Sequence, residues 1–309
     1  MRTLRLYLAL AVASVAGATL LARPAPSSQP GDDVVAVDAV AVDDNGRAVD
    51  DLRQEDFQVR EDGRPVALTS FFSSAARGED AKAGARSVVL LLDDSGVSPR
   101  LTSRVQDIAR QFVSRTGATD ELSVIRLSNR RAEPVSNRKD ALAQIDEYRG
   151  GAVPFFGRET VEVALTRIAT VSRGFDSLQH KRRAIVVIGT PNVFDIDEPI
   201  ERQSSLIWPY WVRALTAAAR ANASVYGIDP TGLAGRLRVQ RNGIVARTGG
   251  ASFYNRNDFT AAVQRVWQDT GHYYLLGYTP PRASSNGELH DINVKTTRPG
   301  VHVRARRTR

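Results

Sequence analysis

Two adjacent carboxylates and a hydroxyl group stand at the end of the most apolar stretch of the sequence. Residues 87–92 read Ser-Val-Val-Leu-Leu-Leu, and Asp93, Asp94 and Ser95 follow them directly. A strand that is apolar at almost every position has both faces covered, which is typical of the centre of a parallel sheet between helices. Open sheets of this kind bind ligands in the crevice outside the carboxyl ends of their strands. We therefore expect a candidate site here, with oxygen atoms that suit a divalent cation or a polar partner.

The same residues have a structural interpretation. Asp and Ser near the start of a helix accept hydrogen bonds from backbone N–H groups, and the spacing of apolar residues predicts a helix over 101–116. A second acidic group, formed by Asp195, Asp197 and Glu198, follows another predicted strand over 184–188. This group is either a solvated loop or a source of further ligands. The sequence leaves both alternatives open.

The pattern of apolar residues predicts a doubly wound, mostly parallel, Rossmann-like α/β fold, because strands alternate with helices from residue 87 onward. The expected strands are 87–92, 122–127, 184–188, 224–228 and 252–254, and the expected helices are 101–116, 140–148, 160–171, 206–221, 244–248 and 258–269. Short alternating strands occupy both ends of the chain, over 34–72 and 272–306. Short strands need partners to bury a face, so we expect the two ends to pair into an accessory β module. Two independent β flaps are the alternative.

The N-terminal residues are typical of an export signal. Arg2 and Arg5 form a short basic segment before the apolar run Leu6–Val15, and Ala16-Gly17-Ala18 supplies a small-residue cleavage site. An uncleaved membrane anchor is the alternative, because apolar residues continue to residue 22. The predicted organisation is a signal peptide over 1–22, a linker over 23–33, an N-terminal β segment over 34–73, a linker over 74–86, an α/β domain over 87–271 and a C-terminal β segment over 272–309.

The composition excludes several classes of function. The net charge is +8, but the arginines are scattered along the chain, so we expect no nucleic-acid partner. The chain has no cysteine, which excludes disulfides, catalytic thiols and thiolate metal sites. Its four histidines show no ligand spacing, so we expect no zinc site. Because a Gly-x-Ser-x-Gly elbow and a phosphate-binding glycine loop are both missing from the sequence, we expect no enzymatic activity.

Several motifs, taken in order, resemble the von Willebrand factor type A superfamily, and more closely the secreted bacterial proteins described as VWFA-related. The resemblance covers most of the chain after the signal. The motifs that carry it are Val37-Asp38, Asp43-Asp44-Asn45-Gly46, Leu52, Asp56-Phe57, Val59, Glu61-Asp62-Gly63, Leu91–Gly96, Arg183–Ile188 and Tyr273–Pro280. It implies an α/β domain that binds other proteins rather than one that catalyses a reaction.

The family's characteristic site is a metal-ion-dependent adhesion site, which holds Mg²⁺ or a similar cation. Its first loop reads Asp-x-Ser-x-Ser, and two further loops supply a Thr and an Asp. Carried over position by position, Asp93 matches the first Asp and Ser95 the first Ser. Val97 stands where the second Ser belongs, and Ser98 comes one place later.

The other two loops also depart from the family pattern. Thr160, beside Glu159, is the nearest match for the Thr, and Gly189-Thr190-Pro191 replaces the acidic third loop. The resemblance therefore implies a weak or vestigial site for Mg²⁺ or another divalent cation. The expected metal ligands are Asp93, Ser95, Ser98 and Thr160. The expected partner-binding residues are Asp94, Phe155, Phe156, Glu159, Thr190, Asp195 and Asp197.

Together these observations predict an exported protein that is periplasmic, secreted or envelope-associated and contacts the membrane only if its signal is uncleaved. We expect a non-enzymatic binding or scaffold domain with a degenerate metal-ion-dependent adhesion site and another envelope or extracellular protein as partner. The alternative is a metal-assisted hydrolase that uses Asp93 and Asp94 with the Asp195 and Asp197 cluster. A purely structural envelope module is a third interpretation.

Overall fold

A computed structural model describes residues 34–77, 86–129, 138–151, 158–175, 182–199, 205–234, 243–282 and 289–309. The chain divides into two units, Met1–Asp32 and Asp33–Arg309, and every described residue belongs to the second. The predicted signal peptide and the linker that follows it lie outside the described residues. Within the described part, every helix is too short or too polar to cross a lipid bilayer.

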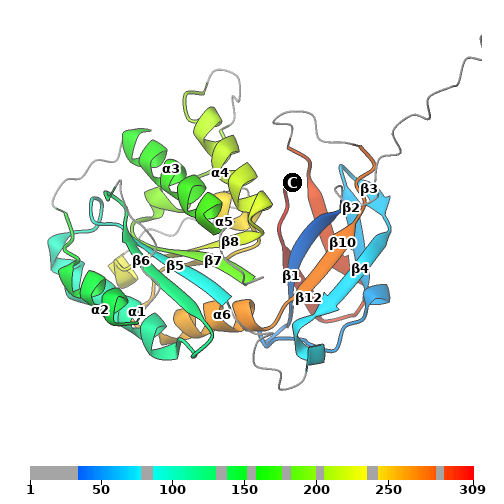
Figure 1. Cartoon of the computed structure of the whole chain (residues 1–309), viewed down its shortest axis with the longest axis horizontal. Coiled ribbons are helices and arrows are strands. Elements are labelled where there is room, and N and C mark those ends of the chain that lie inside the picture. Colours follow the sequence, from blue (N-terminus) through cyan, green and yellow to red (C-terminus); the bar gives the residue numbers. More distant parts are fainter. Residues whose placement is uncertain are drawn as a thin grey trace, which may run out of the picture. The chain divides into compact units, whose positions relative to one another are not determined.

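A five-stranded parallel sheet, in the order β6-β5-β7-β8-β9, forms the centre of the fold (Figure 1). Its strands are β5 (Arg86–Leu92), β6 (Glu121–Arg126), β7 (Arg182–Ile188), β8 (Ala223–Ile228) and β9 (Ser252–Phe253). The strands β5, β7 and β8 are buried at almost every position, as their unbroken apolar sequences require. This confirms the predicted Rossmann-like α/β class.

Helices cover both faces of this sheet (Figure 1). The side chains of Val88, Leu90 and Leu92 join one core with α1, α2 and α6, while Val89 and Leu91 point the other way and join a second core with α3, α4 and α5. The helices are α1 (Thr102–Arg115), α2 (Arg138–Glu147), α3 (Arg158–Gly174), α4 (Trp208–Arg220), α5 (Ile244–Arg247) and α6 (Thr260–Gly271). Short 3-10 helices are η1 (Gln54–Asp56), η2 (Ser74–Arg77), η3 (Pro99–Leu101), η5 (Pro191–Val193) and η6 (Gly232–Ala234).

Strands from the two ends of the described chain pair into two antiparallel sheets, which together form the β module. One sheet has the order β12-β1-β10-β4 and the other β11-β2-β3. The strands are β1 (Val35–Asp43), β2 (Phe57–Glu61), β3 (Arg64–Val66), β4 (Leu68–Ser73), β10 (Tyr274–Tyr278), β11 (Ile292–Thr296) and β12 (Val301–Ala305). Because β1 pairs with β10 and β12, and β2 with β11, the expected accessory module is confirmed and the alternative of independent flaps is wrong.

A buried ionic network joins the β module to the parallel sheet. Arg182, the first residue of β7, forms an ion pair with Asp38 of β1, and both side chains are almost completely buried. The Asn222 side chain also donates a hydrogen bond to Asp38 at 2.9 Å. In the same region Arg304 of β12 pairs with Asp269 of α6, whose carboxylate is likewise buried. Asp38 and Asp269 therefore each have an opposite charge beside them, as burial in a low-dielectric interior requires.

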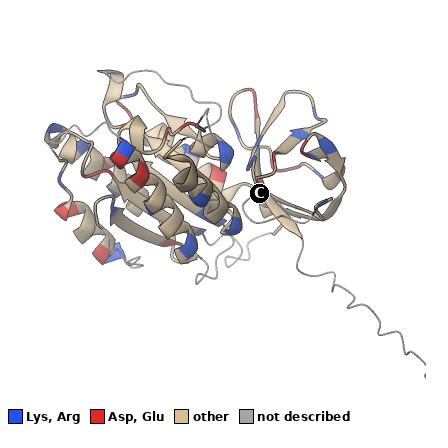
Figure 2. Ribbon diagram, turned by 90° about the horizontal axis from the view of Figure 1, so that it is seen from above, with Lys and Arg blue, Asp and Glu red and all other residues tan. Residues whose placement is uncertain are grey.

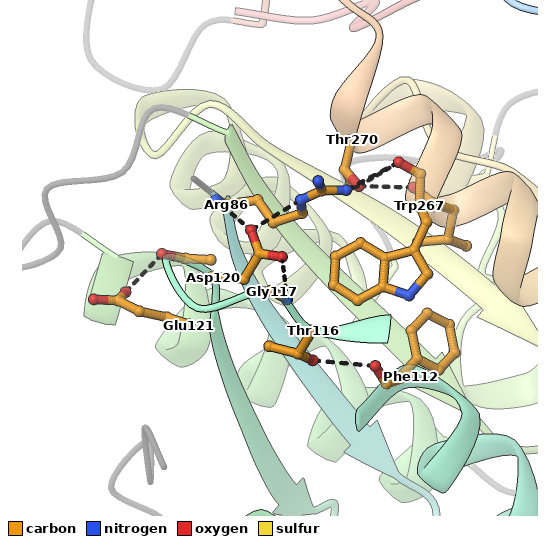
Figure 3. A network of polar contacts seen from close by, with 10 residues as sticks. Arg86, Phe112, Thr116, Gly117, Asp120, Glu121, Trp267 and Thr270 are labelled. Carbon is orange, nitrogen blue, oxygen red and sulfur yellow. Dashed lines mark hydrogen bonds and ion pairs between the residues drawn. The ribbon is translucent and has the colours of Figure 1, made fainter. Parts of the chain in front are cut away.

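A second polar network fixes the amino ends of β5 and β6 (Figure 3). Arg86 pairs with Asp120 at 3.1 Å, and its guanidinium lies over the Trp267 ring of α6 at 4.5 Å from the ring centre. The other Asp120 oxygen accepts the backbone N–H of Gly117 at 2.9 Å. The polar networks therefore anchor the amino ends of the strands, at the end of the sheet opposite to the predicted site.

The remaining Lys and Arg residues are distributed over many elements and interspersed with Asp and Glu (Figure 2).

Candidate functional site at the carboxyl edge of the parallel sheet

Asp93, Gly189 and Asp229 lie in one row at the carboxyl ends of β5, β7 and β8. The backbone N–H of each residue donates a hydrogen bond to the carbonyl oxygen of the last residue of the next strand, with an N to O distance of 3.0 Å. The backbone hydrogen bonds of the sheet therefore continue one residue beyond the strands. The chain leaves β5 toward β6 on one side and returns to β7 on the other side. The topological switch point, outside which open α/β sheets bind their ligands, therefore lies between Asp93 and Gly189.

The carboxylate of Asp93 spans this switch point. Asp93 is completely buried. Its Oδ1 accepts hydrogen bonds from the Ser95 N–H (3.2 Å), the Ser95 hydroxyl (3.1 Å) and the Gly96 N–H (2.7 Å). Its Oδ2 accepts from the N–H and the hydroxyl of Thr190, both at 3.2 Å. Asp93 thus ties the loop after β5 to the loop after β7 through five hydrogen bonds.

Gly189 makes room for this carboxylate. A Cβ atom at position 189 would lie 2.4 Å from Cβ of Asp93 and 3.0 Å from its Oδ2. Both distances are shorter than van der Waals contact allows, so a larger residue would displace the Asp93 side chain. The glycine is therefore needed in the loop where the family pattern places an acidic residue.

The segment after α2 supports the Asp93 loop from the other side. The Tyr148 hydroxyl donates a hydrogen bond to the backbone carbonyl of Asp93 at 2.8 Å. Burial raises the pKa of this phenol, and the charges of Asp93 and Asp94 raise it further, so the hydroxyl keeps its proton. A Cβ atom at Gly151 would lie 2.5 Å from the Asp94 carbonyl oxygen, which shows how closely the two backbones approach. The loop is therefore held on both sides.

Asp94 turns away from Asp93. Its carboxylate accepts hydrogen bonds from the backbone N–H and the hydroxyl of Ser128, which follows β6. The two adjacent carboxylates thus bond to opposite neighbouring loops, one beyond β6 and one beyond β7. In this arrangement both of them fix the shape of the edge.

The hydrogen bonds of the Asp93 carboxylate do not include the other two predicted metal ligands, Ser98 and Thr160. Val97 is completely buried in the core shared with α1, so its side chain points away from the edge. Ser98 is exposed, and its carbonyl group accepts the Leu101 N–H at 2.9 Å. Thr160 is half-buried in the first turn of α3 and contributes none of the five hydrogen bonds to Asp93. Among the described residues, the side chains that donate hydrogen bonds to this carboxylate are those of Ser95 and Thr190.

The predicted partner-binding residues divide into exposed and buried ones. Glu159 and Asp197 are exposed, whereas Asp195 is buried next to Tyr254. Burial raises the pKa of the Tyr254 phenol, and the Asp195 carboxylate raises it further. Glu198, beside them, forms an ion pair with Arg247 at 2.9 Å. Two further residues of this prediction lie outside the described residues, namely Phe155 and Phe156.

The edge also contains Asp229, which the sequence analysis did not single out. Asp229 is 1% exposed, and its Oδ1 accepts hydrogen bonds from the N–H (2.9 Å) and the hydroxyl (2.6 Å) of Thr231. Its Oδ2 is buried and has no hydrogen-bond partner in the described part of the chain. The signal was present in the sequence, since Asp229 ends the apolar run 224–228 as Asp93 ends 87–92.

The oxygens around Asp93 are too few to hold a hard cation tightly. Mg²⁺ and Ca²⁺ take at least six oxygen ligands, waters included, whereas the side chains bonded to the Asp93 carboxylate add only the hydroxyls of Ser95 and Thr190. The carboxylate already accepts five hydrogen bonds, with which an ion would compete. Among the described residues, the only group of three or more His, Asp or Glu ligands lies elsewhere, in the β module. The donor set therefore fits at most a weakly held ion.

No protein-family model matches the sequence, and no curated protein matches it. Solved structures with a similar arrangement include proximal thread matrix protein 1 of the mussel byssus, with a zinc-occupied MIDAS motif (12% identity, 63% of this chain, 48% of that chain, TM-score 0.43). Others are human COPII-coat protein Sec24c (9% identity, 72% and 43%, TM-score 0.39) and the PilB minor pilin of Streptococcus sanguinis (9% identity, 60% and 60%, TM-score 0.35). The chain spans about half the length of the mussel protein and less than two thirds of the others. The fold class rests on the sheet topology described above.

Proposed function

We propose that this chain is an exported, non-enzymatic protein of the von Willebrand factor type A kind, which docks a partner protein at the carboxyl edge of its parallel sheet. The observation that carries this proposal is the Asp93–Thr190 contact. It holds together the two loops that flank the topological switch point. The contact surface consists of the exposed residues around this contact, Ser98, Glu159 and Asp197.

The bonding of the buried acids favours docking over catalysis. A general base or a metal-bound nucleophile needs a carboxylate that is free to accept a proton or to ligate. Asp93 accepts five hydrogen bonds, and Asp94 accepts two from Ser128. In our proposal these acids give the edge a fixed shape, which lowers the entropy cost of binding a partner. A divalent cation contributes little, because the site is degenerate.

Affinity capture of partner proteins from an envelope fraction, with the full chain as bait, tests the docking surface. We expect Glu159→Arg and Asp197→Arg to lose the partner that the native chain captures, because both reverse an exposed charge on the proposed surface. Glu55→Arg, an exposed acid of the β module, is the matched control and keeps the partner. Equal capture by all three variants contradicts the proposed surface. Chelation of divalent ions during capture is expected to change little.

Export is tested separately. The chain is expressed with its own N-terminus, and the protein recovered outside the cytoplasm is analysed by mass spectrometry. We expect a mature N-terminus directly after the small residues Ala16-Gly17-Ala18. Recovery of the intact chain from the cytoplasm alone contradicts export and leaves the docking experiment unaffected.

A further inference from the structure

A cluster of metal-ligating side chains lies in the β module, far in sequence from the edge described above. Glu61 ends β2, Asp62 begins the turn to β3, and His290 precedes β11. One ligand atom of each residue lies within 4.8 Å of those of the other two. His290 Nδ1 is 2.8 Å from Oδ2 of Asp62 and 3.9 Å from Oε1 of Glu61. Two carboxylates and an imidazole therefore face one point.

The backbone aims Asp62 at this point. Its φ of 48° lies in the left-handed region, which an Asp adopts more readily than most residues. The Asp62 N–H donates to the Asp291 carbonyl at 2.8 Å, and Oδ1 of Asp62 accepts the Asp291 N–H at 3.0 Å. These bonds leave Oδ2 directed at the His290 ring. The geometry is thus set before any ion arrives.

Glu61 is held by groups that leave it able to ligate. The Tyr278 hydroxyl donates to its Oε2 at 2.6 Å, and Arg309 donates to Oε2 at 3.0 Å and to Oε1 at 2.7 Å. Burial raises the pKa of Tyr278, and the Glu61 charge raises it further, so this phenol remains a donor. Metal-ligating carboxylates usually carry such supporting hydrogen bonds, which fix their orientation. Oε1 of Glu61 accepts only one of these bonds and keeps a second lone pair for an ion.

The His290 ring is buried, being 4% exposed, yet it makes hydrogen-bonding contacts on one side only. Its Nε2 has no partner among the described residues, so the ring's polar contacts are confined to the carboxylates at Nδ1. Two other histidines pair with a single aspartate at the same 2.8 Å distance, His272 with Asp50 and His302 with Asp44. Both of those rings are about half exposed or more. Of these three described histidines, only His290 combines burial with a second, buried carboxylate.

We propose that Glu61, Asp62 and His290 bind a divalent transition-metal ion of the zinc class, with water completing the coordination. Imidazole nitrogen and carboxylate oxygen are ligands that zinc accepts, at distances of about 2.0–2.2 Å. Tetrahedral coordination places ligand atoms roughly 3.2–3.6 Å apart. The 2.8 Å and 3.9 Å separations at Nδ1 bracket this range, and the ligand atoms of Asp62 and Glu61 lie within 4.8 Å of each other. The half-exposed Asp62 leaves the ion a path from solvent.

The ion ties together segments that are distant in the sequence. The contact between Asp62 and His290 joins the turn after β2 to the segment before β11, and Arg309 pairs with the neighbouring Glu61. Because the folded chain assembles the ligands and the unfolded chain does not, binding stabilises the folded state. This site is independent of the docking edge, so the two proposals stand or fall separately.

Calorimetric titration of the metal-free full chain with zinc chloride tests the proposal. We expect one ion per chain, and binding weakened about tenfold or more by Asp62→Asn, which removes a charged ligand. His302→Gln, at an ordinary His–Asp pair, and Ser95→Ala, at the docking edge, are expected to bind zinc as the native chain does. Cobalt replacing zinc gives a visible absorption that Asp62→Asn diminishes.

Asp62 is half exposed, so Asp62→Asn is expected to fold, and the circular dichroism of the metal-free protein verifies this. His290→Gln is a second variant, with the same expected loss of zinc binding. Absence of stoichiometric zinc binding overturns the proposal. Equal zinc affinity of folded Asp62→Asn and the native chain also overturns it, as does loss of binding in Ser95→Ala.

Discussion

Arg182 at the start of β7 and Asp38 in β1 form an ion pair that is almost wholly removed from water. The pair links a strand of the parallel sheet to a strand of the β module, 144 residues apart in the sequence. The nearby Asp38 charge raises the pKa of the guanidinium against the opposing effect of burial, so Arg182 stays charged. The two parts of the described chain are therefore joined by a buried pair of opposite charges.

Replacing one partner of this ion pair by an apolar residue is expected to destabilise the protein strongly. Arg182→Met leaves Asp38 buried without its opposite charge, which costs about 3–5 kcal/mol in the free energy of unfolding. Arg110→Ala, which removes exposed ion pairs with Asp107 and Asp146, is the control and should cost about 1 kcal/mol or less. Urea denaturation measures both. Similar losses in the two variants contradict the role given to the buried pair.

Gly189→Ala tests the close approach at the switch point. The new Cβ would lie 2.4 Å from Cβ of Asp93, and such overpacking costs about 1–3 kcal/mol. Gly271→Ala, near the end of α6, is the control, because its Cβ would meet only Arg86 at an ordinary 3.6 Å. Thermal unfolding compares the two. If the Gly189→Ala protein is as stable as the native chain, the Asp93 loop moves to accommodate the new methyl group at little cost in stability, which contradicts the close packing described here.

Val97→Ser tests whether the family's missing hydroxyl can be restored. Val97 is completely buried in the core, so the substitution loses apolar contacts and buries a hydroxyl, at a cost of about 1–3 kcal/mol. We expect no gain in Mg²⁺ affinity, because the side chain points away from Asp93. Calorimetric titration with Mg²⁺ and urea denaturation measure the two effects. Tighter Mg²⁺ binding by the variant contradicts the structural account of a degenerate site.

Buried tyrosines make the protein sensitive to alkali. Burial raises the pKa of Tyr226 and of Tyr274 to about 12, above the ordinary 10.0. A phenol that ionises more easily in the unfolded chain stabilises the fold fully below pH 10, and this contribution is lost as pH rises toward 12. We therefore expect the free energy of unfolding to fall over that interval. Tyr274→Phe, which lacks one such phenol, should show a shallower fall in urea denaturation at each pH.

The fold was largely predictable because its core strands carry a local signal. The apolar runs at 87–92, 184–188 and 224–228 appear as β5, β7 and β8, each within two residues of the expected start. The predicted helix over 101–116 appears as Thr102–Arg115. The pairing of the chain ends also followed from sequence, since short strands need partners. In all of these cases the determining pattern lies within a few neighbouring residues.

The site was less predictable because its contacts come from distant loops. The sequence identified Asp93 and Ser95, but only the structure shows that Thr190 bonds to Asp93, 97 residues away. The sequence shows that Gly189-Thr190-Pro191 replaces the family's acidic third loop, but only the structure shows that Gly189 makes room for the Asp93 carboxylate. The His290 cluster gives no spacing signal, since Asp62 and His290 are 228 residues apart. Ligands that meet only through strand pairing leave no local pattern.

The position of β1 between β10 and β12 constrains the order in which the chain can acquire its structure. During synthesis β1 has to wait for neighbours made more than two hundred residues later, whereas the parallel sheet can assemble from nearer segments. Until then β1 carries two open edges, and another chain could pair with either of them. Translocation in an extended state, or a chaperone bound to residues 35–43, would protect the strand during that interval.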